Sequence, residues 1–260
     1  MIGELALEGG GGEPVDLSRT LASHGVATLP PQLVDPGGGT LETTLARDGG
    51  RPATIRVRRA PGGVVSVEVL GERLPAKEQR ALLAVAHQIL GLEEDLSRFY
   101  ELAAADPAIA WVGAGAGRML RSPTVFEDLT KTICTTNCSW SATVRMVTSI
   151  VERLGDTAPD GRRAFPGPAE MAAAGEGFYR DVARAGYRGG YLLRLATEVA
   201  EGRLDLEGLR DGDLPDDEVT RRLLALPGVG PYAAAHVMVI SLGRYRQLIL
   251  DYGRDRHTRA

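Results

Sequence analysis

The sequence predicts a mostly α-helical protein with a small N-terminal α+β unit that contains an antiparallel sheet. Two observations predict this fold class. Before residue 75, short segments alternate apolar and polar side chains with the period of half-buried strands, whereas from Pro75 onward apolar residues recur at helical spacing. A chain of 260 residues is long enough for two modest domains. We therefore expect an α+β domain over 1–74 and a helical domain over 75–260.

Three strands are expected in the N-terminal domain, over 40–45, 53–58 and 64–69. Turns at 48–52 and 60–63 separate them, and their glycines can supply the positive φ values that hairpins need. The strands should therefore pair as consecutive antiparallel hairpins.

The expected helices are marked by residues that favour helix starts and stops. Thr124 and Glu127 fit a capping box, in which each side chain binds the backbone amide of the other residue. A second helix follows Ser139 and stops at Gly155. Its apolar stripe is expected to hold Trp140, Val144, Val147, Val151 and Leu154. Other helices are expected over 16–23, 82–90, 168–174, 178–185, 191–201, 216–224 and 232–242.

Charge excludes one class of nucleic-acid-binding protein. A net charge of −4 argues against a chain that coats nucleic acid through bulk positive potential, although it allows a local basic patch. Arginines gather in 221–260, while carboxylates gather in 201–218. The basic end is either a solvated face or a surface that meets phosphate.

Composition also bounds location and cofactors. No apolar run approaches the roughly 20 residues of a membrane span, and residues 1–5 lack the pattern of a secretory signal. We therefore expect a cytoplasmic protein without a membrane partner, and a monomer by default. Cys134 and Cys138 are the only cysteines, so no four-cysteine metal or iron–sulfur site can be built. Both are expected to be buried structural thiols, and no metal site is expected.

A glycine turn between two expected helices is the most informative motif. Residues 226–230 read Leu-Pro-Gly-Val-Gly and are followed by Pro231. Gly228 and Gly230 allow a tight turn whose backbone amides can face outward. Outward amides at a helix N-terminus bind phosphate, and such a turn can also hold a monovalent cation. The alternative is a purely structural connector between helices.

Asp251 stands nineteen residues after Tyr232 and follows the apolar run 248–250. The segment resembles the helix-hairpin-helix (HhH-GPD) DNA glycosylase superfamily, in which a Leu-Pro-Gly-Val-Gly hairpin is followed at this spacing by a catalytic aspartate. The resemblance implies that Leu226, Gly228, Val229 and Gly230 bind DNA and that Asp251 is catalytic. In isolation, an aspartate after an apolar run is more often a helix cap.

Two further segments add to the resemblance. Residues 133–139 look like the family's helix–turn that inserts a wedge residue into the duplex, which places Asn137 at the wedge. Tyr187 and Arg188, after Gly186, match the loop that supports the orphaned partner base in the 8-oxoguanine branch. The alternatives are a loop cap for Asn137 and an ordinary surface pair for Tyr187 and Arg188. The N-terminal sheet unit is similar to that of inducible bacterial 3-methyladenine glycosylases.

The resemblance implies a base-excision enzyme that acts on double-stranded DNA containing a damaged base. Asp251 would stabilise the positive charge that develops on the sugar and orient water. The family's lyase lysine is replaced here by Tyr232, which predicts a monofunctional hydrolase. Tyr232 and His236 would line the base pocket, with core packing as the alternative. Cationic alkylated purines, being good leaving groups, are favoured as substrates, whereas Asn137, Tyr187 and Arg188 favour an oxidised purine.

Other hypotheses remain open at this stage. The family continues for several helices past its aspartate, whereas this chain has nine residues after Asp251, so we expect a helical domain shortened at its C-terminal side. A catalytically impaired or non-catalytic helix-hairpin-helix DNA-binding protein is one alternative. A helical interaction protein with a structural hairpin is another.

Overall fold

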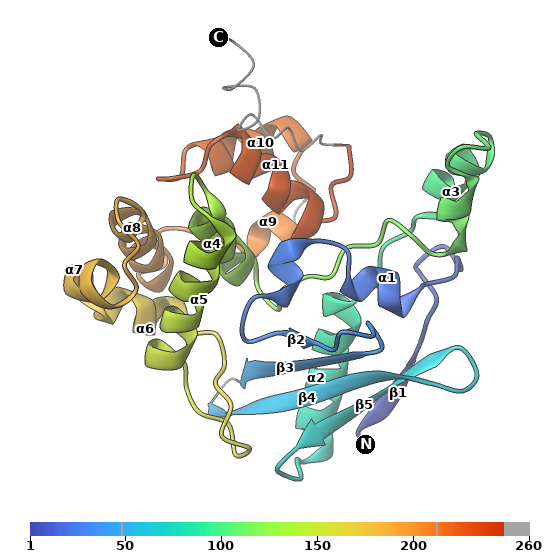
Figure 1. The fold of residues 1–260 in the computed structure, drawn as a ribbon, viewed down its shortest axis with the longest axis horizontal. Coiled ribbons are helices and arrows are strands. Elements are labelled where there is room, and N and C mark those ends of the chain that lie inside the picture. Colours follow the sequence, from blue (N-terminus) through green and yellow to red (C-terminus); the bar gives the residue numbers. More distant parts are fainter. Residues whose placement is uncertain (48, 212, 247–260) are drawn as a thin grey trace. The chain divides into compact units, whose positions relative to one another are not determined.

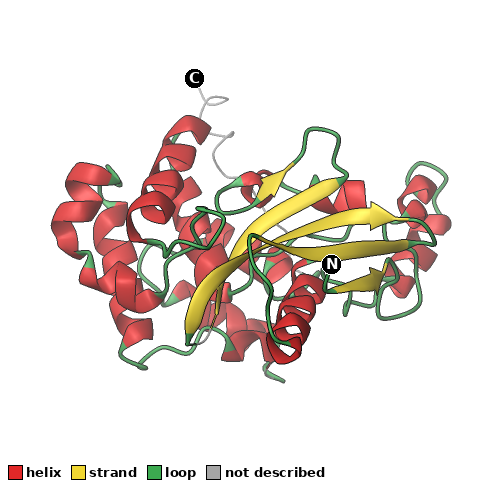
Figure 2. Cartoon of the chain, turned by 90° about the horizontal axis from the view of Figure 1, so that it is seen from below, coloured by secondary structure: helices red, strands yellow, loops and turns green. Residues whose placement is uncertain are grey.

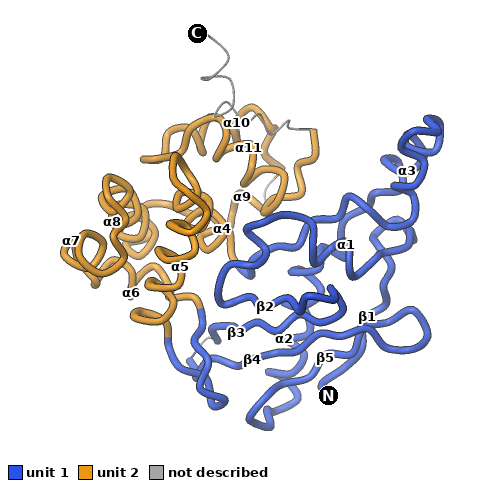
Figure 3. Tube along the Cα trace, in the orientation of Figure 1, with its two compact units in different colours: residues 1–123, 156–164 blue, residues 124–155, 165–260 orange. Residues whose placement is uncertain are grey.

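The computed structural model describes residues 1–47, 49–211 and 213–246. The chain forms two compact units (Figure 3). Unit 1 contains residues 1–123 and 156–164, and unit 2 contains 124–155 and the chain from 165 onward. The boundary that we predicted after residue 74 lies inside unit 1, because the first long helix shares its core with the sheet.

Unit 1 is built on a five-stranded antiparallel sheet in the order β1-β5-β4-β3-β2 (Figures 1 and 2). The three predicted strands are confirmed as β3 (Thr40–Arg47), β4 (Gly50–Ala60) and β5 (Val64–Leu70). They pair consecutively, as the turn chemistry predicted. The edge strands β1 (Gly3–Ala6) and β2 (Leu33–Val34) were not predicted.

Helix α2 (Ala76–Ile89) covers one face of this sheet (Figure 1). Its residues Leu82, Ala86 and Ile89 belong to the same buried cluster as Ile55 and Val67 of the sheet. This shared core stabilises both elements, since burying one large aliphatic side chain contributes about 1.5–3 kcal/mol. The fold therefore continues through α2 rather than ending before it.

Shorter helices complete the first part of unit 1. Helix α1 (Leu17–Leu21) begins after Asp16, whose side chain caps the helix by accepting a hydrogen bond from the backbone amide of Arg19. The remaining helices are η1 (Gly25–Thr28), α3 (Ser97–Ala104) and η2 (Ala110–Ala114), of which η1 and η2 are 3₁₀ helices.

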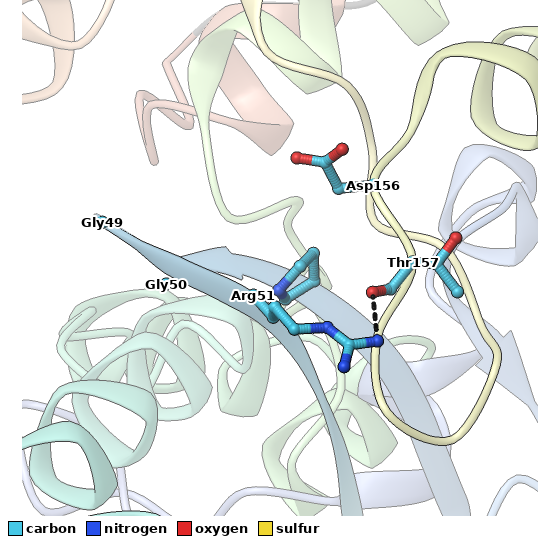
Figure 4. A pocket seen from close by; sticks show the side chains of 6 residues that line it. Gly49, Gly50, Arg51, Asp156 and Thr157 are labelled. Carbon is cyan, nitrogen blue, oxygen red and sulfur yellow. Dashed lines mark hydrogen bonds between the residues drawn. The ribbon is translucent and has the colours of Figure 1, made fainter.

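Residues 156–164 return from unit 2 to the sheet. Their ends form a bridge between Thr157 and Arg163. The hydroxyl of Thr54 donates to Asp160 at 3.0 Å, and Arg162 pairs with Glu42. An open hollow of about 510 Å³ lies between this segment and the start of β4, where Arg51 donates to the Thr157 carbonyl (Figure 4). The hollow is lined by Gly49, Gly50, Arg51, Pro52, Asp156 and Thr157.

Unit 2 is helical, as predicted. Helix α4 is buried from Val125 to Cys134 and contacts α5, α8 and α11, so it forms the centre of this unit. Within α4, Lys131 pairs with Glu127 at 2.7 Å, one helical turn apart. The helices are α4 (Val125–Thr135), α5 (Trp140–Leu154), α6 (Pro168–Ala173), α7 (Gly175–Gly177), α8 (Arg188–Ala200), α9 (Gly208–Asp211), α10 (Asp216–Leu224) and α11 (Pro231–Ile240).

Two sequence expectations for unit 2 need correction. The segment predicted as a helix over 178–185 is a short π-helix, η3 (Phe178–Val182), in which Ala183 donates to the carbonyl of Phe178 five residues earlier. The predicted stripe of α5 is confirmed at Val147 and Val151, whereas Trp140 and Val144 are exposed. The buried side of α5 also carries Thr143, Met146 and Ile150, which were not predicted.

Within the described ranges, no helix has the length and apolar character needed to cross a membrane.

Candidate nucleic-acid interface

The glycine turn joins α10 to α11 as the sequence predicted. Gly228 has a φ of +80°, a value that glycine adopts at little cost, and Val229 donates back to the carbonyl of Leu226. Gly230 is the N-cap of α11, and Pro231 occupies the first helical position, where the missing amide costs no hydrogen bond. The turn thus directs the positive end of the α11 dipole outward, which suits an anion.

A second feature makes Gly228 necessary. A Cβ atom built on Gly228 would lie 2.5 Å from Cδ2 of Tyr191 and 3.1 Å from its Cβ. The ring of Tyr191, which belongs to α8, therefore occupies the space that a side chain at Gly228 would need. The shape of the turn and the position of this ring depend on each other.

Asn137 lies in the turn between α4 and α5. Its φ of +46° is left-handed, a conformation that asparagine tolerates better than most residues with a side chain. Ser139 then caps α5 by accepting from the amide of Ala142 at 3.3 Å. Asn137 is exposed at the tip of this turn, which is the placement a wedge residue requires.

Tyr187 and Arg188 lie beside Asn137, so the structure brings these three predicted residues together. The side-chain amide of Asn137 donates from Nδ2 to the Tyr187 hydroxyl at 3.4 Å. Arg188 donates from Nε to the carbonyl of Thr136 at 2.9 Å, and its guanidinium lies 4.5 Å from the centre of the Tyr187 ring. Tyr187 is 56% exposed, whereas Arg188 is only 7% exposed. Arg188 therefore holds the turn that carries Asn137, and its direct contact with DNA stays a prediction.

Tyr191 connects the two turns. Its ring meets that of Tyr187 edge to face, with the ring centres 5.9 Å apart. A continuous run of contacts therefore leads from Asn137 through Tyr187 and Tyr191 to Gly228. Sequence reasoning missed Tyr191, although it follows Tyr187, the N-cap of α8, by four residues, a spacing that places side chains side by side at a helix.

No family model matches the sequence. A DNA-3-methyladenine glycosylase of Bacillus subtilis (strain 168) is 24% identical over 180 residues, which cover 66% of this chain. These residues span 59% of the length of that curated relative.

Solved structures of similar fold cover most of the chain. The 3-methyladenine DNA glycosylase from Archaeoglobus fulgidus has a TM-score of 0.72 at 21% identity, over 93% of this chain and 79% of that one. MBOgg1 in complex with a low-affinity DNA ligand gives 0.70 at 20% identity, over 92% and 77%. The 8-oxoguanine glycosylase/lyase of Clostridium acetobutylicum in its apo form gives 0.62 at 20% identity, over 82% and 81%.

The chain has the fold of these DNA glycosylases. The resemblance inferred from the sequence is thereby confirmed at the level of the fold, and the similar structures cover most of the chain.

Within this glycosylase fold, the two predicted pocket residues are neighbours on α11. The rings of Tyr232 and His236 lie with their centres 5.7 Å apart and are inclined by 37°. His236 is buried and Tyr232 is half-buried. Their contact with an extruded base stays a prediction, as does the alternative of core packing.

The side chains of Lys131, Cys134 and Cys138 differ in how deeply they are buried. Lys131 is fully buried beside Glu127 and lies 5.8 Å from the centre of the Phe165 ring. Burial raises the pKa of the Cys134 thiol to about 12, so this side chain is neutral at pH 7. Cys138 is half-buried, less than predicted. In the part of the chain that the structure describes, no group of three histidine, cysteine or acidic side chains is placed to hold a metal.

Asp251, the predicted catalytic residue, lies in 247–260, outside the described residues.

Proposed function

We propose that the protein is a base-excision DNA glycosylase that hydrolyses the N-glycosidic bond of a damaged purine rotated out of double-stranded DNA. The observation that carries the proposal is the run of contacts that joins the exposed Asn137 to the hairpin turn at Gly228. A base can be attacked at its glycosidic carbon only after it leaves the stack. An enzyme of this kind therefore needs a group that fills the gap and a second group that grips the backbone nearby.

Asn137 and the hairpin turn supply those two groups. Unstacking a base costs a few kcal/mol, which a side chain inserted into the gap can offset. Asn137 projects from a turn whose backbone is held by Arg188, so less backbone freedom remains to be lost on insertion. The N-terminus of α11 would meanwhile hold a backbone phosphate, or a phosphate and a monovalent cation. No other cofactor is proposed.

Asp251 would carry the chemical step. Cleavage of the glycosidic bond develops positive charge on the sugar, as in glycoside hydrolysis. A fixed carboxylate stabilises that charge and can orient or deprotonate the attacking water. Because a cationic alkylated purine leaves readily, modest electrostatic help is sufficient for such a base.

We propose a monofunctional hydrolase, since a lyase needs an amine that forms a Schiff base. The sequence has two lysines. Lys131 is fully buried in an ion pair, and Lys77 is an exposed residue of α2. Tyr232 takes the position where the family's lyases have their lysine. The expected product is an abasic site in an intact strand, made by a cytoplasmic monomer.

An oxidised purine is the second candidate substrate. The contact between Asn137 and Tyr187 favours it, because this pair resembles the wedge and partner-base loop of the 8-oxoguanine branch. Tyr232 beside His236 favours an alkylated purine instead, since an aromatic ring stacks on a cationic base.

A panel of duplexes, each with one alkylated, oxidised or deaminated base, tests the proposal. We expect release of an alkylated purine, with strand scission only after alkali. Asp251→Asn should lower the rate by about 10²–10³, as loss of a charge-stabilising group does. Asp255→Asn makes the same change four residues away and should leave the rate unchanged.

Three results would contradict the proposal. Full activity of Asp251→Asn would place the chemistry elsewhere. Salt-dependent binding to duplex DNA without release of any base would favour a non-catalytic helix-hairpin-helix protein. Absence of binding to an abasic-site analogue would favour a helical interaction protein.

A further inference from the structure

Tyr191 has an unusual environment for an aromatic residue of a helical unit. One side of its ring lies against Gly228, where no Cβ intervenes. Another side meets the ring of Tyr187. Tyr191 nevertheless remains 36% exposed, and Tyr187 is 56% exposed. These two rings therefore contribute less to the core of unit 2 than fully buried aromatic residues would.

The contacts of Tyr191 reach two functional elements of the proposed enzyme. Gly228 belongs to the turn that would grip phosphate, and its lack of a Cβ atom leaves room for the ring. Tyr187 accepts a hydrogen bond from Asn137, the proposed wedge. A shift of the hairpin turn would press on Tyr191, and a shift of Tyr191 would move the partner of Asn137.

We infer that Tyr191 is a positioning residue that ties the phosphate-gripping turn to the wedge, so that backbone binding and base extrusion occur together. The inference rests on the proposed function. It assigns to Tyr191 no contact with the base and no part in bond cleavage. Its ring keeps Tyr187, and through it Asn137, in register with the turn at Gly228.

The contribution expected from this ring is modest. An edge-to-face aromatic contact changes an equilibrium by about 2- to 12-fold. Tyr191→Leu should therefore weaken base extrusion by about that factor, while affinity for undamaged duplex changes less than about twofold. Tyr191→Phe keeps the ring and should behave like the wild type.

The experiment uses the full chain and a duplex with a tetrahydrofuran abasic analogue next to 2-aminopurine. The fluorescence of 2-aminopurine rises when its stacking is lost, so it reports insertion at the gap without any catalytic step. We expect a weaker response with Tyr191→Leu and a full response with Tyr191→Phe. Arg194→Ala, an exposed change on the same helix, should give the wild-type response.

A double-mutant cycle separates positioning from a general structural effect. If Tyr191 acts through Asn137, Tyr191→Leu should cause no further loss once Asn137→Ala is present. Additive losses would overturn the inference, as would a wild-type response from Tyr191→Leu. If Tyr191→Leu unfolds, Tyr191→Met, which keeps apolar bulk against Gly228, takes its place in the cycle and must show the same coupling.

The same assay distinguishes the inference from the function on which it rests. Absence of any fluorescence response from the wild-type chain, together with absence of base release, would overturn the proposed glycosylase. A normal wild-type response that is indifferent to Tyr191 would overturn the positioning role alone.

Discussion

Two of the turns between helices in unit 2 use a left-handed residue in opposite ways. At the turn between α10 and α11, the residue is Gly228, and the ring of Tyr191 fills the place of a side chain. At the turn between α4 and α5, the residue is Asn137, whose exposed side chain donates to Tyr187.

The difference shows what each turn offers to a ligand. A left-handed residue with a Cβ costs about 1–2 kcal/mol relative to glycine. That cost is avoided at Gly228, where backbone amides are the useful groups. It is accepted at Asn137, where the side chain is the useful group, and Arg188 secures the turn by binding the carbonyl of Thr136.

Of the substitutions considered for these two turns, Gly228→Ala should have the largest effect on stability. Gly228→Ala combines the left-handed penalty with a Cβ at 2.5 Å from the Tyr191 ring, so we expect a loss of about 2–4 kcal/mol in the free energy of unfolding. Urea denaturation would measure it. Gly190→Ala on α8 meets open space and should be neutral or slightly stabilising. Equal stability of the two variants would contradict the geometry of the hairpin.

Removing the support of the other turn should have the next largest effect. Arg188→Met keeps the length of the side chain but loses the hydrogen bonds to Thr136, and we expect a loss of about 1–3 kcal/mol. Thermal unfolding would show it. Arg194→Met on the exposed face of α8 serves as the matched control and should stay within about 0.5 kcal/mol of the wild type. The contact between Asn137 and Tyr187 should weaken only in the Arg188 variant.

At Asn137, glycine and alanine should separate stability from function. Glycine adopts the left-handed φ of position 137 at little cost, whereas alanine does not. The free energy of unfolding of Asn137→Gly should therefore exceed that of Asn137→Ala by about 1 kcal/mol. Both variants lose the wedge and should be equally slow in releasing a base from duplex DNA. A comparison of melting temperatures with single-turnover rates would test this. Faster base release by the glycine variant would argue against a wedge role.

The cysteines next to the Asn137 turn should differ in reactivity. Burial raises the pKa of Cys134 to about 12, so its thiolate is scarce at pH 8, whereas Cys138 is half-buried. A thiol reagent should modify Cys138 first and reach Cys134 only on unfolding. Because the folded pKa exceeds the unfolded one, the stability contributed by this neutral thiol is complete below about pH 8.5 and falls as pH rises toward 12. Rapid labelling of Cys138→Ala would contradict this.

Much of the fold could be predicted because local patterns agree with tertiary structure there. The hairpins of β3, β4 and β5 follow from alternation and glycine turns, and the start of α4 follows from Thr124, which accepts from the amide of Glu127. The edge strands β1 and β2 are too short to show a period. The boundary predicted after residue 74 falls inside unit 1. Periodicity indicates whether a segment is a helix or a strand, but it does not indicate the core on which that segment packs.

In the candidate site, too, some features could be predicted from local motifs and others depend on tertiary packing. The hairpin and the proximity of Asn137 to Tyr187 could be inferred from motifs in the family's order. The burial of Arg188 could not, since an arginine after a tyrosine is as compatible with solvent as with a backbone carbonyl. The α5 stripe was misplaced because Trp140 and Val144 were given more weight than Thr143 and Met146, which are buried. The packing of Tyr191 on Gly228 joins residues far apart in the sequence, and no local pattern reports it.

The path of the chain has a consequence for how the protein is made. Residues 124–155 are synthesised before 156–164, yet the later segment supplies Asp160 and Arg162 to the sheet of unit 1. A nascent chain that ends at residue 123 therefore lacks part of unit 1. Unit 1 can be completed only after helices α4 and α5 and residues 156–164 have been synthesised. A chimera that exchanges the N-terminal part between relatives should carry 156–164 with it, or the transplanted sheet will lose those two partners.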